Sequence, residues 1–337
     1  MEKKKKTKVI AGIVVLAVLI LAVLCVNVYL KEKQNTQNTK YTEAQEEKKQ
    51  LEEKQKALKE KQAEAENAEN TTQEQQAEED ADSEESLTEE QLAEEDAPDL
   101  EAIRASVEEK LQGTDEFGEA WQIYVYRLKD GARASLGQGR LTAASLIKLY
   151  IMGAVYSSYD NIVAANGQEQ VDKLLNAMIT VSDNDSANTL VGMLGNGDNA
   201  AGQEAVNTYC KNNGYTDTSM GRMLLEKASA NENYTSARDC SVFLKNIYEN
   251  KLEHSEDMLN LLKQQTRTEK IPKGIPSGVE TANKTGELDH VENDAAIVFD
   301  GENPYIICVM ADNLSDTTEA RQRIVDISSV VYENISK

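Results

Sequence analysis

The sequence predicts an α+β fold for residues 100–337: an antiparallel sheet of about five strands, flanked by helices, plus a helical subdomain. Two observations support this class. Helical patterns fill the stretch from about residue 142 to 265, and strand patterns lie on both sides of it. The strand candidates are 121–127, 132–136, 278–286, 294–299 and 305–311. Because these strands come from both ends of the domain, the sheet must join distant parts of the chain.

Individual elements follow from local patterns. Residues 121–127 alternate at the period of a strand, and Asp130-Gly131 is typical of a turn that leads into a second strand. In residues 316–335 apolar side chains recur at helical spacing, which predicts a closing helix.

The first thirty residues have the pattern of a membrane anchor. Residues 1–8 are rich in lysine, and the uncharged run at 9–30 would reach about 33 Å as a helix, enough to cross a hydrocarbon core. A cleaved signal peptide is the competing interpretation, but no small-x-small cleavage site follows the run. We expect a single-pass helix with a cytoplasmic basic stub at 1–8 and everything after it outside the cell membrane.

Residues 31–99 are predicted to form a polar linker. Ala44, Leu51, Leu58 and Ala65 recur every seven residues, which favours a solvated helix over a stable coiled coil because the heptad has no second apolar position. Residues 62–103 contain 17 Asp/Glu and no Lys/Arg. The later part of the linker is therefore expected to be acidic and disordered.

Charge and composition exclude several classes of protein. The formal net charge is −23, so the chain lacks the basic surface that nucleic-acid binding requires. It contains 2 His and 4 Cys. Their spacing predicts neither a zinc site nor a disulfide framework, although one disulfide among Cys210, Cys240 and Cys308 stays open. No metal or cofactor is predicted, and the oligomeric state is left undetermined.

A Ser-x-x-Lys motif is the first candidate for chemistry. Ser145 and Lys148 are three residues apart at the start of an apolar helix that extends to about Tyr156, so they share one helical face. An ammonium group buried in such a helix is costly, and burial lowers the pKa of a lysine. This arrangement suits a serine nucleophile with a lysine base. When the motif is considered alone, a chance occurrence of Ser and Lys at this spacing explains it equally well.

Two further triplets follow at a distance. Ser182-Asp183-Asn184 lies on a predicted helix–helix connection, where one side chain can cap a helix while the others face a cleft. Lys284-Thr285-Gly286 ends a predicted strand, where glycine permits close approach and lysine can hold an anionic group. Each triplet alone is better explained as a cap or a polar turn.

The three motifs together resemble the S-x-x-K, S-D-N and K-T-G set of class A β-lactamases and penicillin-binding DD-peptidases. Three further segments, residues 177–188, 234–239 and 293–298, also resemble sequences of that family. The resemblance therefore covers about residues 100–337. It implies a β-lactamase/DD-peptidase-like fold. It also implies roles for individual residues. Ser145 is the nucleophile, Lys148 its base, Ser182 a proton donor, and the substrate-binding residues are Asn184, Lys284, Thr285, Gly286 and Glu287.

The family's deacylation base is where the match fails. Class A enzymes use a glutamate in the omega loop, followed four residues later by asparagine. Glu226 is the nearest candidate in this stretch, but residue 230 is alanine, and Glu232 lies too close to the following helix. The resemblance therefore implies acylation without identifying a base for deacylation.

Three functions follow as alternatives. The first is a membrane-tethered, extracytoplasmic serine hydrolase that opens β-lactam rings through a Ser145 acyl-enzyme. The second is a penicillin-binding peptidase that processes D-alanyl peptides of the cell wall. The third is a non-catalytic binding or scaffold protein on the same fold. Serine-dependent glutaminases share S-x-x-K, but Lys284-Thr285-Gly286 argues against them.

Overall fold

A computed structural model describes residues 100–114, 118–227 and 231–336 of the chain. These residues belong to a compact unit, Leu87–Lys337. The predicted basic stub at 1–8, membrane helix at 9–30 and linker at 31–99 lie outside the described residues. Within the described part, no helix has the length and apolar character needed to cross a membrane.

A five-stranded antiparallel sheet with the order β2-β1-β7-β6-β5 confirms the predicted fold class. Its strands are β1 (Ala120–Arg127), β2 (Arg133–Leu136), β5 (Glu280–Leu288), β6 (Val291–Phe299) and β7 (Tyr305–Asp312). The predicted strands at 278–286 and 294–299 are displaced by a few residues, because β5 and β6 pair in register as far as Leu288 and Val291. A second sheet, β3 (Leu141–Thr142) with β4 (Tyr234–Thr235), was not predicted.

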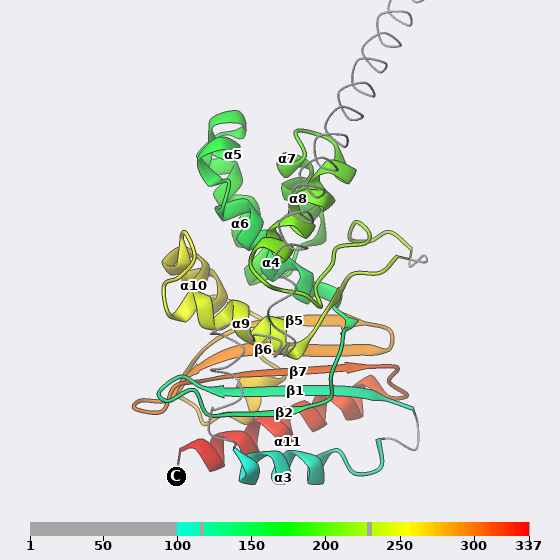
Figure 1. Cartoon of the computed structure of the whole chain (residues 1–337), viewed down its shortest axis with the longest axis vertical. Coiled ribbons are helices and arrows are strands. Elements are labelled where there is room, and N and C mark those ends of the chain that lie inside the picture. Colours follow the sequence, from blue (N-terminus) through cyan, green and yellow to red (C-terminus); the bar gives the residue numbers. More distant parts are fainter. Residues whose placement is uncertain (1–99, 115–117, 228–230, 337) are drawn as a thin grey trace, which may run out of the picture. The chain divides into compact units, whose positions relative to one another are not determined.

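The sheet is covered on both faces, as Figure 1 shows. On one face lie α3 (Glu101–Lys110) and α11 (Thr317–Ile335), which confirms the predicted closing helix. Alternate residues of β7 serve the two faces: Ile307 and Val309 join the cluster with α11, whereas Cys308 joins the cluster with the helical part. Burial on both faces explains why β7 is almost uniformly apolar.

The helical part packs on the other face of the sheet. Its helices are α4 (Ile147–Tyr156), α5 (Tyr159–Asn166), α6 (Gln168–Thr180), α7 (Asn184–Leu194), α8 (Asn199–Asn212), α9 (Ala237–Tyr248) and α10 (Ser255–Lys263). Helix α4 lies at its centre with every residue buried, as its sequence predicts, because Lys148 is its one charged residue among apolar neighbours. The thiols of Cys210, Cys240 and Cys308 are free and buried. The helical part thus places the start of α4 against the sheet.

Candidate active site

Ser145 lies in a short 3-10 turn, Ala144–Leu146, that leads directly into α4. The preceding residue, Ala144, has a φ of +47°. A left-handed conformation is unfavourable for a residue with a Cβ, so the surrounding structure must hold this turn. Asn293 of β6 does so, because its Nδ2 donates to the carbonyls of Thr142 at 3.0 Å and Ala143 at 3.2 Å. The turn fixes Ser145 near the positive end of a buried helix.

Lys148 is fully buried one turn after Ser145. Its Nζ lies 2.6 Å from the Ser182 carbonyl oxygen, 2.7 Å from Asn184 Oδ1, and 3.1 Å from the hydroxyls of both Ser145 and Ser182. The carbonyl and amide oxygens can only accept hydrogen bonds, whereas the hydroxyls can also donate. A neutral amine would direct two N–H groups to those oxygens and leave its lone pair for a hydroxyl proton.

The electrostatic environment favours that neutral amine. The pKa of Lys148 is lowered to about 7, mainly by burial; the negative charge of Asp183 opposes this shift, and the positive charge of Arg267 contributes to it. Burial also brings the pKa of Lys284 well below its ordinary value, with help from the charges of Lys148 and Arg267. Near neutral pH a substantial fraction of Lys148 can therefore accept a proton.

If Ser145 is acylated with Lys148 as its base, as the motif resemblance implies, the acylation rate should follow the titration of Lys148. Lowering the pH from about 8 to about 6 passes through the pKa of Lys148, so the free amine is protonated and acylation should slow by about tenfold. The measurement is the rate of covalent adduct formation with a penicillin across this range. A flat profile would contradict the assignment of Lys148 as the base.

In the Ser182-Asp183-Asn184 triplet one residue caps a helix and the other two contact Lys148; the sequence predicts the cap. Asp183 caps α7 by accepting a hydrogen bond from the backbone N–H of Ser186 at 2.7 Å. Ser182 has a φ of +62°, and this conformation turns both its carbonyl and its hydroxyl toward Lys148. Asn184 is the first residue of α7. Helix capping and contacts with Lys148 therefore coexist in three consecutive residues.

Lys284, Thr285 and Gly286 lie on β5, an edge strand of the sheet. Lys284 Nζ donates to Ser182 Oγ at 2.9 Å and to the Thr285 carbonyl at 2.8 Å. A Cβ on Gly286 would lie 2.9 Å from the Ala143 carbonyl oxygen and 3.2 Å from Ser145 N. Only glycine allows β5 to approach the serine turn so closely.

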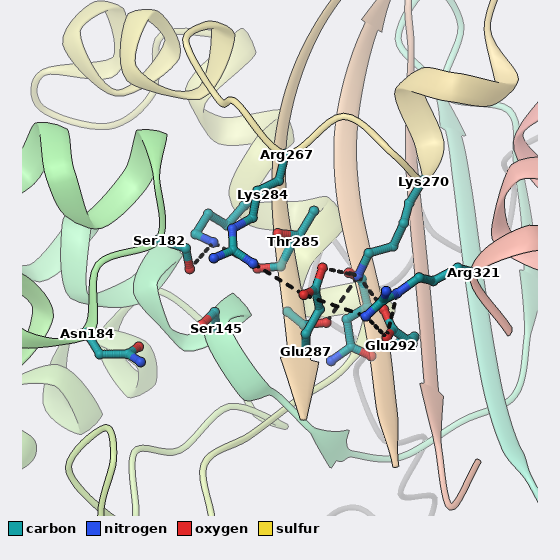
Figure 2. Close-up of polar contacts among 12 residues, drawn as sticks. Ser145, Ser182, Asn184, Arg267, Lys270, Lys284, Thr285, Glu287, Glu292 and Arg321 are labelled. Atoms are coloured by element: carbon teal, nitrogen blue, oxygen red, sulfur yellow. Dashed lines mark hydrogen bonds and ion pairs between the residues drawn. The ribbon is translucent and has the colours of Figure 1, made fainter. Parts of the chain in front are cut away.

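Five predicted site residues are thus joined by direct contacts: Ser145, Lys148, Ser182, Asn184 and Lys284. Thr285, Gly286 and Glu287 continue along β5 beside them (Figure 2). In the described part of the chain, no cluster of three or more His, Cys, Asp or Glu side chains could hold a metal ion. The chemistry available here is that of hydroxyls, amines and an amide.

The loop between α8 and β4 approaches the same face of α7. Asn188, one turn after Asn184, accepts from Leu224 N and donates to the Leu224 carbonyl, both at 2.9 Å. Leu224 is 7% exposed. Glu226 is exposed instead, and its carboxylate accepts from Met223 N at 3.2 Å within the loop. A leucine, rather than the candidate base Glu226, is therefore held against the helix that carries Asn184.

A group of charged side chains that the sequence did not predict lies next to the site. They are Arg267, Lys270, Glu292 and Arg321, which meet around Glu287 (Figure 2). Arg267 and Lys270 precede β5 in an irregular segment, and Arg321 comes from α11. No spacing rule joins residues from such distant elements, so the sequence held no signal for this group.

The fold matches solved structures of β-lactamases and of a penicillin-binding protein. PBP-A is 21% identical, with a TM-score of 0.61 over 70% of this chain and 97% of PBP-A. The β-lactamase of Sphaerobacter thermophilus is 21% identical, with a TM-score of 0.58 over 68% and 96% of the two chains. The extended-spectrum β-lactamase TLA-1 is 18% identical, with a TM-score of 0.61 over 70% and 99%. At these identities the likeness shows the fold.

A match to a family profile shows which protein family the chain belongs to. The profile described as "Beta-lactamase enzyme family" matches residues 161–335. The chain belongs to this family. No curated protein sequence matches it significantly. Membership of the β-lactamase family and the shared fold support a serine hydrolase of the β-lactamase/penicillin-binding type.

Proposed function

We propose that the chain opens β-lactam rings by acylation of Ser145, as an extracytoplasmic enzyme tethered by residues 9–30. The observation that carries the catalytic part is the set of contacts at Lys148, whose amine lies 3.1 Å from Ser145 Oγ. The basic stub and the long apolar run support the tether. A penicillin G acyl-enzyme is described for a mutant of the similar PBP-A, which favours the same class of substrate here.

Acylation then proceeds in two steps. Ser145 transfers its proton to Lys148 Nζ while Oγ bonds to the lactam carbonyl carbon, and the carbonyl electron pair moves to oxygen. The backbone N–H groups of Ser145 and Glu287 stabilise that oxyanion, a role supported by the close approach of Gly286 to Ser145 N. The carbonyl re-forms as the C–N bond breaks, and the leaving nitrogen needs a proton.

Ser182 supplies this proton. Its Oγ lies 3.1 Å from Lys148 Nζ and 2.9 Å from Lys284 Nζ, so it can regain a proton from a lysine as it gives its own to the leaving nitrogen. Lys284 and Thr285 bind the substrate carboxylate, and Asn184 holds Lys148 and the substrate amide. Lys148 thus contacts the hydroxyls of both Ser145 and Ser182, so it can pass the proton taken from Ser145 on to Ser182.

A specific observation favours a second candidate, a penicillin-binding peptidase with slow deacylation. Asn188 holds the backbone of Leu224 against α7, the Leu224 side chain cannot activate water, and the Glu226 carboxylate accepts a hydrogen bond within its own loop. Hydrolysis of the acyl-enzyme requires a general base near the ester. The two candidates differ in turnover, so parallel records of adduct and drug loss separate them. A brief adduct with continuing drug loss supports a β-lactamase, and a persistent adduct supports the peptidase.

Replacing Leu224 by glutamate should accelerate deacylation. A carboxylate at this loop position would lie beside the helix that carries Asn184, and general-base catalysis contributes about 10²-fold or more. The measurement is the decay rate of the penicilloyl adduct. Leu225→Glu is the matched control, because Leu225 is 68% exposed, and it should leave the decay rate unchanged. Equal decay in both variants would contradict the placement of Leu224.

A further inference from the structure

The two backbone N–H groups proposed to bind the oxyanion come from distant parts of the chain. The N–H of Ser145 belongs to the 3-10 turn Ala144–Leu146, called the serine turn below, and the N–H of Glu287 belongs to β5. Donors of this kind stabilise a transition state only when both point at the place where the charge develops. The serine turn and β5 must therefore be held at a fixed separation.

Asn293 of β6 connects these segments. It is fully buried and is paired with Gly286 in the register of β5 and β6. Its Nδ2 donates to the carbonyls of Thr142 at 3.0 Å and Ala143 at 3.2 Å, and its Oδ1 accepts from Ala311 N of β7 at 3.1 Å. Both ends of the amide are thus used. One side chain ties the start of the serine turn to the middle of the sheet.

The contact with Ala143 acts at the strained point of the serine turn. The Ala143 carbonyl belongs to the peptide unit that leads into Ala144, whose φ is +47°. An alanine keeps a left-handed conformation only where its surroundings hold it. The same carbonyl accepts from Leu146 N at 3.0 Å within the turn, whereas Asn293 ties it to the sheet. Without the amide, Ala144 can relax and turn the Ser145 N–H away.

The backbone of Asn293 is fixed to the other donor as well. The buried Lys270 donates from Nζ to the Asn293 carbonyl at 2.9 Å and to the Gly286 carbonyl at 3.3 Å. The Gly286 carbonyl and the Glu287 N–H belong to one planar peptide unit, so holding the carbonyl also sets the direction of the N–H. Asn293 therefore lies between the two donors and is in contact with the support of each.

We propose that Asn293 is a positioning residue for acylation: its side-chain amide sets the separation of the Ser145 and Glu287 N–H groups that receive the developing oxyanion. The inference rests on the proposed acylation of Ser145. Because the oxyanion exists only in the transition state and the intermediate, Asn293 affects the acylation step. Binding of the intact substrate depends on other side chains, among them Lys284 and Thr285.

The test is Asn293→Ala in the full chain. The dependence of adduct formation on penicillin concentration separates the acylation rate constant at saturation from the dissociation constant of the non-covalent complex. The rate constant should fall by about 10²-fold, and the dissociation constant should stay within about threefold of the wild type. A merely structural role would reduce the fraction of chains that is labelled and leave the rate constant of that fraction unchanged.

A second variant tests the mechanism through the turn. Glycine adopts a positive φ without steric cost, so Ala144→Gly removes the strain that Asn293 is proposed to hold. Added to Asn293→Ala, it should restore the acylation rate constant by about tenfold. An unchanged rate constant in Asn293→Ala, or a fall that Ala144→Gly does not reverse, would overturn the positioning role. So would failure of both variants to fold, because Asn293 is then chiefly structural.

Ser255→Ala is the matched control. The buried Ser255 hydroxyl donates to the Leu252 carbonyl at 2.7 Å and accepts from Leu252 N at 3.2 Å, so this variant also removes a side chain that holds backbone groups. It should leave the acylation rate constant unchanged. Failure of the wild type to form any adduct would instead overturn the proposed function.

Discussion

Replacing Ser145 by alanine is expected to abolish covalent labelling by penicillin, lowering the acylation rate by about 10³-fold or more. The reason is chemical: the variant has no hydroxyl 3.1 Å from the Lys148 amine, so no acyl-enzyme can form. Alanine fits the 3-10 turn, which already contains Ala144. The measurement is the mass shift of the intact chain after incubation with the drug.

The control for this variant is Ser157→Ala at the other end of α4. Ser157 is an exposed residue, and its hydroxyl donates to the Ala154 carbonyl at 2.9 Å, away from the contacts of Lys148. This variant should be labelled like the wild type. Labelling of Ser145→Ala at the wild-type rate would show that another residue is the nucleophile.

Replacing Lys148 by methionine should lower acylation by a similar factor without unfolding the protein. Methionine has nearly the volume of lysine, and the side chain is fully buried, so the change removes a polar group from an apolar helix. Ser182 and Asn184 lose a donor, which limits any gain in stability. We expect about 10³-fold slower adduct formation, with a melting temperature within a few degrees of the wild type.

Lys173→Met is the matched control, because Lys173 is an exposed lysine on α6. It should leave both labelling and stability unchanged. If Lys148→Met is acylated at the wild-type rate, the proton of Ser145 is accepted elsewhere. If it unfolds, Lys148 is chiefly structural, because a volume-conserving apolar residue then fails to replace it.

The sheet could be predicted because its strands have local sequence patterns, namely alternation and turn residues. Alternation in residues 121–127 and the Asp130-Gly131 turn predicted the β1–β2 hairpin. The two-residue strands β3 and β4 could not be predicted, because so short a pair has no period to detect. The boundaries of β5 and β6 moved because cross-strand pairing, rather than hydrophobicity, decides where the hairpin ends.

The candidate site also contains residues that local sequence patterns predict and residues that only long-range contacts position. Ser145 and Lys148 were predictable because a single lysine in an otherwise apolar helix requires an explanation, and their contact follows from helical spacing. Their meeting with Ser182 and Lys284 was implied by the resemblance of the motif set. Arg267 was not predictable, since its position depends on a backbone hydrogen bond from Thr266 to Thr180 and on one from the Asn283 side chain to the Arg267 carbonyl.

The most direct test is peptide mapping of the full chain after brief incubation with a penicillin, with drug loss recorded in parallel. We expect one adduct per chain, on the peptide that contains Ser145, and no adduct in Ser145→Ala. An adduct on another residue would contradict the assignment of the nucleophile. Absence of both adduct and drug loss would contradict the proposed chemistry and favour a binding or scaffold protein on this fold.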